Sequence, residues 1–132
     1  MTLADLDLHF DMVTQLTEAR DRLQSMRSFL KAQSLDGMPR GSDASRKVEK
    51  LAILIQQQEP EVRRLERIVA KSEVEVRAFI NTIPDIRAQH IFSLRFLCGF
   101  SWPEVAEACG GKNTPDAVKS VCYRYLKGGS EP

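Results

Sequence analysis

Two short capped helices near the C-terminal end hold the residues best suited to chemistry in this chain of 132 residues. Ser101 can cap the first helix, and Glu104, three residues later, completes a capping box. Thr114 can cap the second, with Pro115 in its first turn. A glycine turn joins the pair and another helix precedes it, which is typical of a helix-turn-helix. Because the second helix of that motif enters the major groove of DNA, the predicted chemistry is recognition of bases and phosphates.

The helix that follows Thr114 is amphipathic and is predicted to run to Gly128. Its expected buried stripe consists of Val118, Val121, Cys122 and Tyr125. The residues that lie away from this stripe are Asp116, Lys119, Ser120, Tyr123 and Arg124. Trp102 is expected to pack across the two short helices and fix their angle. For Tyr123, a DNA contact and a surface filler are both open.

A supporting helix is predicted between Pro84 and Gly99, where the glycine ends it. Its expected core face consists of Ile86, His90 or Ile91, Leu94 and Leu97. Arg95 is expected to brace the module through a carboxylate such as that of Glu104.

Charge limits how such a module can bind DNA. The chain carries 19 basic and 18 acidic side chains, a net charge of +1, which excludes non-specific binding driven by bulk charge. Residues 1–83 hold thirteen side chains of each sign, whereas residues 84–127 hold six basic and four acidic ones. One copy should therefore bind DNA weakly and lose less affinity with salt than a basic module would. A dimer, two half-sites or RNA polymerase as co-binder would supply the missing affinity.

Residues 1–83 are predicted to form a long helical segment. Residues 3–33 contain no glycine or proline, and their apolar residues recur at steps of three and four, the pattern of one amphipathic helix. A loop near 35–42 follows, with Ser42 or Asp43 as the cap of the next helix; it contains Gly37, Pro39, Arg40 and Gly41. This loop allows an antiparallel hairpin within one chain, and pairing between two chains stays open.

The second long helix carries a heptad repeat. Every a position is β-branched, which favours two-stranded packing: Val48, Ile55, Val62, Val69, Val76 and Ile83. The d positions are Leu51, Leu65 and Phe79, with Gln58 and Ser72 as polar interruptions. Pro60 occupies an outward f position and removes a backbone hydrogen bond, so a kink or break is expected near residues 57–59. The predicted fold is all-α: a long helical hairpin or coiled coil over 1–83, a helix-turn-helix module over 84–128 and a tail over 129–132.

Other chemistry has less support. Cys98, Cys109 and Cys122 are odd in number and lack CxxC spacing, so we expect free core cysteines and neither disulfides nor zinc. His9 and His90 have no partners at ligand spacing and are expected to be structural. No Ser/His/Asp or Cys/His set occurs at plausible spacing, so we expect no enzyme and no cofactor. The sequence shows neither a signal peptide nor a membrane-spanning apolar run, which predicts a cytoplasmic protein with no membrane partner.

The stretch IRAQHIFSLRFLCGFSWPEVAEACG, continued by DAVKSVCYRYL, resembles region four of sigma factors. It shares an Arg-aromatic-Leu helix, a turn of the type sW-x-E-V/I-A and a recognition helix with V-K-S. The whole chain is similar to phage and prophage late-gene transcription regulators of the ArpU/RinA type. Those proteins place a helical segment and a loop like GMPRG before such a module. The similarity covers the C-terminal module well and the preceding residues loosely.

This resemblance implies a sequence-specific transcription regulator that binds double-stranded DNA at a promoter with RNA polymerase, as a monomer or a homodimer. It assigns DNA contacts to the loop and the recognition helix: Lys112, Thr114, Pro115, Asp116, Lys119, Ser120, Tyr123 and Arg124. Lys119 and Arg124 would meet phosphates or guanine edges, and the N-terminus of the helix could accept a phosphate. The GGKNT turn is longer than in typical region four, and the recognition helix is only mildly basic.

Two further functions are compatible with the same pattern. A small terminase subunit, which packages phage DNA, would also combine a helix-turn-helix with helical oligomerisation. A factor that binds RNA polymerase or a sigma factor would use the module to contact protein instead of bases.

Overall fold

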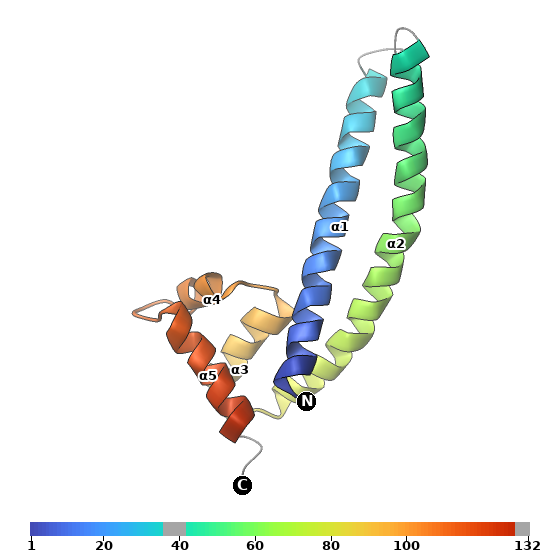
Figure 1. The fold of residues 1–132 in the computed structure, drawn as a ribbon. Helices are drawn as coiled ribbons and strands as arrows, with labels where there is room; N and C mark the ends of the chain where they lie inside the picture. The colour runs from blue at the N-terminus through green and yellow to red at the C-terminus, as the bar shows by residue number, and fades with distance from the viewer. Residues whose placement is uncertain (36–41, 129–132) are drawn as a thin grey trace. The chain divides into compact units, whose positions relative to one another are not determined.

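A computed structural model describes residues 1–35 and 42–128, and this part of the chain contains helices and no strand. The elements are α1 (Leu3–Leu35), α2 (Ser42–Asn81), α3 (Ile86–Phe92), the π-helical turn η1 (Ser93–Leu97), α4 (Trp102–Cys109) and α5 (Pro115–Gly128) (Figure 1). The predicted all-α class, a long helix pair followed by shorter helices, is confirmed. None of the described helices is long and apolar enough to cross a membrane. The predictions for Gly37, Pro39, Arg40, Gly41 and the tail fall outside the described residues.

The chain divides into two compact units, one of which is the helix pair Gln15–Ile68. Here α1 and α2 run antiparallel (Figure 1). They bury an apolar seam formed by Leu16, Ala19, Leu23, Ile55, Val62 and Leu65. Two ion pairs bridge the helices, Arg20 with Glu66 at 3.4 Å and Arg27 with Glu59 at 3.1 Å. The two long helices therefore pair within one chain.

Of the kink or break predicted near residues 57–59, the break is wrong, because α2 runs through Pro60 without interruption. The helix continues from Ser42 to Asn81 with Pro60 inside it and exposed. An outward proline removes one hydrogen bond on the solvent side, while Ile55 and Val62 stay buried in the seam. Tertiary packing thus outweighs the local cost. The predicted heptad pattern extends past the end of α2: the helix ends at Asn81, and Ile83, the last predicted a position, lies two residues later but is still buried.

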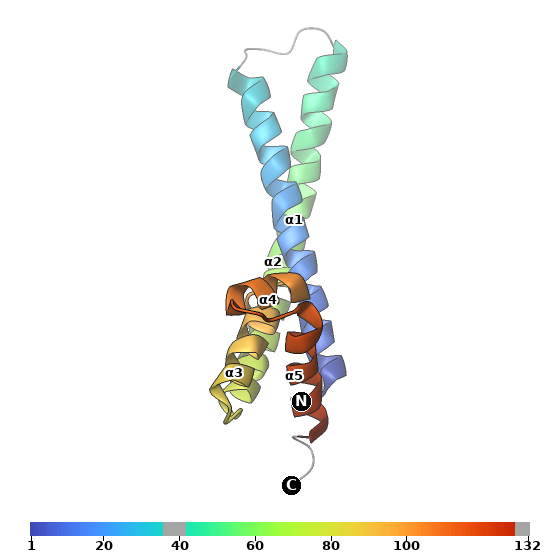
Figure 2. The same cartoon turned by 90° about the vertical axis from the view of Figure 1, so that its left-hand side faces the viewer.

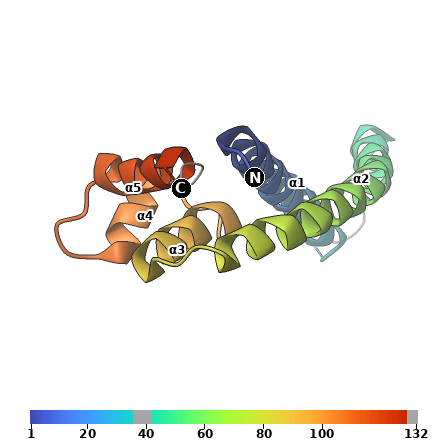
Figure 3. The same ribbon diagram turned by 90° about the horizontal axis from the view of Figure 1, so that it is seen from below.

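The second unit combines Met1–Thr14 with the chain from Val69 onward. Helices α3 and α5 lie side by side with α4 across one end of the pair (Figure 2), and the view from below separates the three helices (Figure 3). One apolar core joins these helices to the ends of the long ones: Leu6, Val76 and Ile80 are buried in the same cluster as Phe92 and Phe96. The predicted boundary after residue 83 therefore separates segments that share a core.

The supporting helix differs from its prediction in two respects. Ile86, expected in the core, is 81% exposed, whereas of the alternatives His90 and Ile91 the buried one is Ile91, as expected. The buried face consists of Ala88, Ile91, Phe92 and Phe96, with the expected Leu94 and Leu97 half-buried. Asp85 caps α3 by accepting a hydrogen bond from the backbone N–H of Arg87. The helix then widens into η1, in which the backbone N–H of Cys98 donates to the carbonyl of Ser93 at 3.0 Å. Apolar spacing cannot reveal such a turn, because one extra residue per turn changes the face that follows it.

His9 is a buried polar side chain in the second unit, 1% exposed. Its Nδ1 lies 2.7 Å from the hydroxyl oxygen of Ser72, one of the two polar interruptions of the heptad. Burial lowers the pKa of His9, opposed by the charge of the Glu73 carboxylate. His9 therefore acts as a neutral imidazole whose hydrogen bond links α1 to α2.

We predict that this buried histidine makes stability sensitive to mild acid. Because the pKa of His9 in the folded chain lies below its ordinary value of 6.5, the unfolded chain takes up more protons as the pH falls through that value. The free energy of unfolding, measured in urea, should therefore fall between about pH 7.5 and about pH 5.5. His9→Gln should flatten this dependence, whereas the exposed-site control His90→Gln should keep it. Equal pH slopes in the wild type and in His9→Gln would contradict the assignment.

Candidate nucleic-acid interface

Helix α4 begins with the capping box that the sequence predicts. The Ser101 hydroxyl accepts from the backbone N–H of Glu104 at 3.3 Å, and the Glu104 carboxylate accepts from the backbone N–H of Ser101 at 2.9 Å. These bonds lower the pKa of the Glu104 carboxyl and satisfy two backbone donors at the start of a short helix. Val105 and Ala106 are buried behind the cap. The start of α4 and its buried side are thereby both fixed.

The turn between α4 and α5 is longer than a minimal one, and two side chains hold it. Gly110 and Gly111 have φ angles of +73° and +65°, which favour glycine. The side-chain amide of Asn113 donates to the carbonyl of Gly110 at 2.7 Å, and its oxygen accepts from the Arg87 guanidinium at 3.0 Å. Arg87 thus ties the start of α3 to the turn before α5. Neither side chain was singled out from the sequence, because residues 87 and 113 are joined only by the tertiary fold.

Helix α5 is oriented by its cap and its buried stripe. The Thr114 hydroxyl accepts from the backbone N–H of Ala117 at 3.1 Å, so the predicted cap is confirmed. Val118 and Cys122 are fully buried, and the ring of Tyr125 meets Phe92 edge-on at 5.8 Å. Burial raises the pKa of the Cys122 thiol to about 12. With this face packed inward, the opposite face of α5 is presented to solvent.

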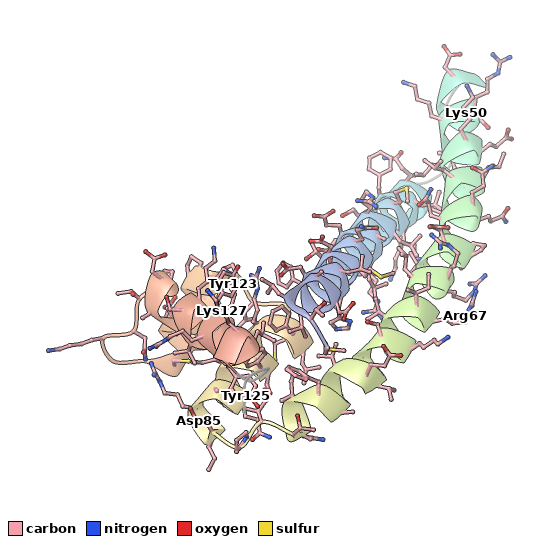
Figure 4. All side chains as sticks on the ribbon, turned by 60° about the horizontal axis from the view of Figure 1, so that its bottom comes forward. Lys50, Arg67, Asp85, Tyr123, Tyr125 and Lys127 are labelled. Carbon is pink, nitrogen blue, oxygen red and sulfur yellow. The ribbon has the colours of Figure 1, made fainter. Side chains whose placement is uncertain are left out.

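The predicted site residues gather on that exposed face and on the turn before it. Lys119 is half-buried, and the other seven are exposed. The exposed ones are Lys112, Thr114, Pro115, Asp116, Ser120, Tyr123 and Arg124. The Lys119 ammonium lies 5.4 Å from the centre of the Tyr123 ring, and the Arg124 Nε donates to the carbonyl of Ser120 at 3.4 Å. Figure 4 shows Tyr123 and Tyr125 on different sides of α5. The face and the turn thus carry three cations, one carboxylate and three hydroxyls.

Arg95 braces the module, but its partners are aromatic rings and not the expected carboxylate of Glu104. The guanidinium carbon lies 3.6 Å from the centre of the Phe10 ring and 4.6 Å from that of Trp102. Its Nη1 donates to the carbonyl of Phe100 at 3.0 Å. Burial lowers the pKa of Arg95, opposed first by the charge of Asp7. One arginine therefore connects α1, η1 and the start of α4.

Trp102 extends this arrangement to the candidate interface. Its ring meets the ring of Tyr123 edge-on, with centres 6.4 Å apart. A continuous series of cation–π and edge-on contacts therefore runs from Phe10 through Arg95, Trp102 and Tyr123 to Lys119. The expected packing of Trp102 across the two helices is confirmed. Tyr123, 38% exposed, both packs on Trp102 and faces solvent.

The cysteines are free, and only one of them is a full core residue. Cys122 is buried and Cys109 is half-buried, but Cys98 is exposed, so the expectation that all three lie in the core is wrong for Cys98. It follows η1, where the chain leaves the helix. In the described part of the chain, no group of three or more His, Cys, Asp and Glu side chains is placed to hold a metal ion.

Comparison of the chain with known protein families, with curated proteins and with solved structures finds no match.

We predict that removing the Arg95 guanidinium loosens the module. Arg95→Met keeps most of the apolar stem but loses two ring contacts and a hydrogen bond. The free energy of unfolding should fall by about 1–2 kcal/mol. The emission of Trp102, the single tryptophan, should also change because the cation leaves its ring. Arg124→Met, at an exposed site, should change stability by less than about 0.5 kcal/mol. Equal stability of the two variants, with unchanged emission from Trp102, would contradict the role of Arg95.

Proposed function

We propose that this protein is a sequence-specific DNA-binding transcription regulator of the phage or prophage type, which acts at a promoter with RNA polymerase and is not an enzyme. The observation that carries the proposal is the exposed face of α5, whose opposite side is fixed by buried Val118 and Cys122. Rigid presentation of a helix face is what readout of base edges requires, because each hydrogen bond depends on position. The resemblance of the sequence to sigma region four supports the same assignment.

In this proposal the face divides into positioning and reading groups. Lys112 in the turn and the first backbone N–H groups of α5 would meet phosphates, which fixes the register of the helix. Lys119, Ser120 and Arg124 would approach base edges, where arginine and lysine pair best with guanine. Tyr123 would contact the sugar-phosphate backbone while its ring stays against Trp102. Asp116 would repel phosphates near it and so contribute to discrimination among docking positions.

The modest charge of the module explains why a partner belongs to the proposal. Residues 84–127 have only two more basic than acidic side chains, so few counterions would be released on binding. Affinity of a single copy would therefore be low, and its dependence on salt shallow. RNA polymerase bound at the same promoter, or a second copy on a second half-site, would raise the effective affinity without new contacts on α5.

A mobility-shift assay and a footprint on intergenic DNA beside the gene test the proposal. Lys119→Ala with Arg124→Ala should reduce affinity by about tenfold to a hundredfold and make the salt slope shallower by up to about two. The matched control is Arg67→Ala with Lys71→Ala, which removes the same charge from exposed positions of α2 (Figure 4 labels Arg67). The control should leave the footprint unchanged. No protected site at low salt, or equal losses in both double variants, would contradict DNA reading by α5.

A further inference from the structure

The two sides of the helix pair in Gln15–Ile68 differ in chemistry. One side carries the ion pairs of Arg20 with Glu66 and of Arg27 with Glu59. The other side holds an open groove of about 510 Å³ along the seam, lined by Asp21, Arg22, Ser25, Met26, Leu54 and Gln58. The seam is therefore bridged by ion pairs on one side, and on the other side it borders a groove in which Met26 and Leu54 lie among four polar side chains.

Large apolar side chains stand exposed on the groove side. Leu54 lines the groove and is 45% exposed. Phe29 is 58% exposed and lies three and four residues after Met26 and Ser25, so it shares their face of α1. Exposed apolar side chains grouped around a groove are typical of an interaction site.

The basic end of this groove face lies near the start of α2. Lys50 and Lys47 precede Leu54 by four and seven residues, so they stand on the same face of the helix. Both side chains are exposed. An occupant of the groove would therefore meet two ammonium groups at this end.

The opposite end carries acidic groups. Glu18 precedes Arg22 by four residues and shares its face, and Asp21 lines the groove itself. Glu61, seven residues after Leu54, adds a carboxylate on α2, which is paired with Arg64. Exposed Asp43, four residues before Lys47 on the same face, leaves the basic end with one positive charge in excess. Arg22 and Arg64 leave the opposite end with one negative charge in excess. The charge along the groove face therefore runs from basic at Lys47 to acidic at Glu18.

We propose that a second copy of this chain covers the groove, packed antiparallel to the first around a two-fold axis near Phe29 and Leu54. A two-fold pair places each end of the face against the other end of its partner, so the acidic groups meet the lysines. A parallel pair would set like charges together. Phe29 and Leu54 of both copies would be buried at the centre, in a four-helix arrangement. The proposal concerns the helix pair alone and holds whether or not α5 binds DNA.

The mass of the full chain in solution, measured by light scattering, tests this proposal without DNA. We expect twice the 14.9 kDa of one chain at micromolar concentration. Phe29→Glu and Leu54→Glu should each shift the mass toward that of one chain, because a carboxylate would be buried in the interface. Val74→Glu is the matched control: Val74 is an exposed apolar residue of α2 at 69%, outside the groove, and its change should leave the dimer intact. Circular dichroism checks that all three variants stay helical.

Charge reversal tests the antiparallel orientation. Lys47→Glu with Lys50→Glu should weaken the dimer, and adding Glu18→Lys with Asp21→Lys should restore it. A wild-type chain that is monomeric, or larger than a dimer, would overturn the proposal. So would a dimer that Phe29→Glu and Leu54→Glu leave unchanged. A dimer that the lysine reversals leave as strong as the wild type would show that the lysines do not face acidic groups, and it would overturn the antiparallel arrangement.

Discussion

The structure depends on one constraint, the inability of three short helices to bury a core by themselves. Helix α3 has seven residues and α4 has eight, lengths at which an isolated helix is marginal in water. Their apolar residues gain a full environment only with Leu6 of α1 and with Val76 and Ile80 of α2. Phe92 lies at the centre of this core, within 6 Å of the rings of Phe79, Phe96 and Tyr125. The N-terminal end of α1 and the C-terminal end of α2 are therefore part of the unit that carries the candidate interface.

Two polar side chains make this shared core specific. Apolar contacts favour burial but say little about which rotation of a helix is correct. His9 on α1 meets the Ser72 hydroxyl on α2, and Arg95 in η1 contacts both Phe10 and Trp102, so each side chain joins elements that lie far apart in the chain. The His9 imidazole is neutral and hydrogen-bonded, and the Arg95 guanidinium is stacked on aromatic rings, so a different packing would leave both groups without these contacts. His9 and Arg95 therefore favour one packing of the helices over others.

Local signals in the sequence were sufficient for the caps and for the buried side of α5. The Ser101 and Glu104 box, the Thr114 cap and the stripe with Val118 and Cys122 depend on neighbours within four residues. For this reason the exposure of most of the predicted site residues also followed from spacing. DNA contact by those residues stays a prediction, because exposure alone does not select a ligand.

Tertiary effects account for what the sequence did not reveal. The continuation of α2 through Pro60 depends on the seam, and the exposure of Ile86 depends on where α3 begins after its Asp85 cap. The partners of Arg95 could not be found by spacing, because Phe10 lies 85 residues away in the chain and an arginine beside a helix start is usually paired with an acid. Arg87 and Asn113 were missed for the same reason.

The distribution of charge connects the candidate interface with the groove of the helix pair. A strongly basic module could hold DNA as a single copy, but its binding would depend little on sequence. Here the cations of α5 are few, so contacts to bases would carry a larger share of the binding energy, and occupancy would depend on a second attachment. A self-complementary groove with opposite charges at its two ends is one way to provide that attachment, since linking two readers multiplies their affinities without adding charge to either. Weak charge on α5 and an open groove on the helix pair are thus compatible with the two proposals taken together, in which specificity would come from α5 and affinity from assembly.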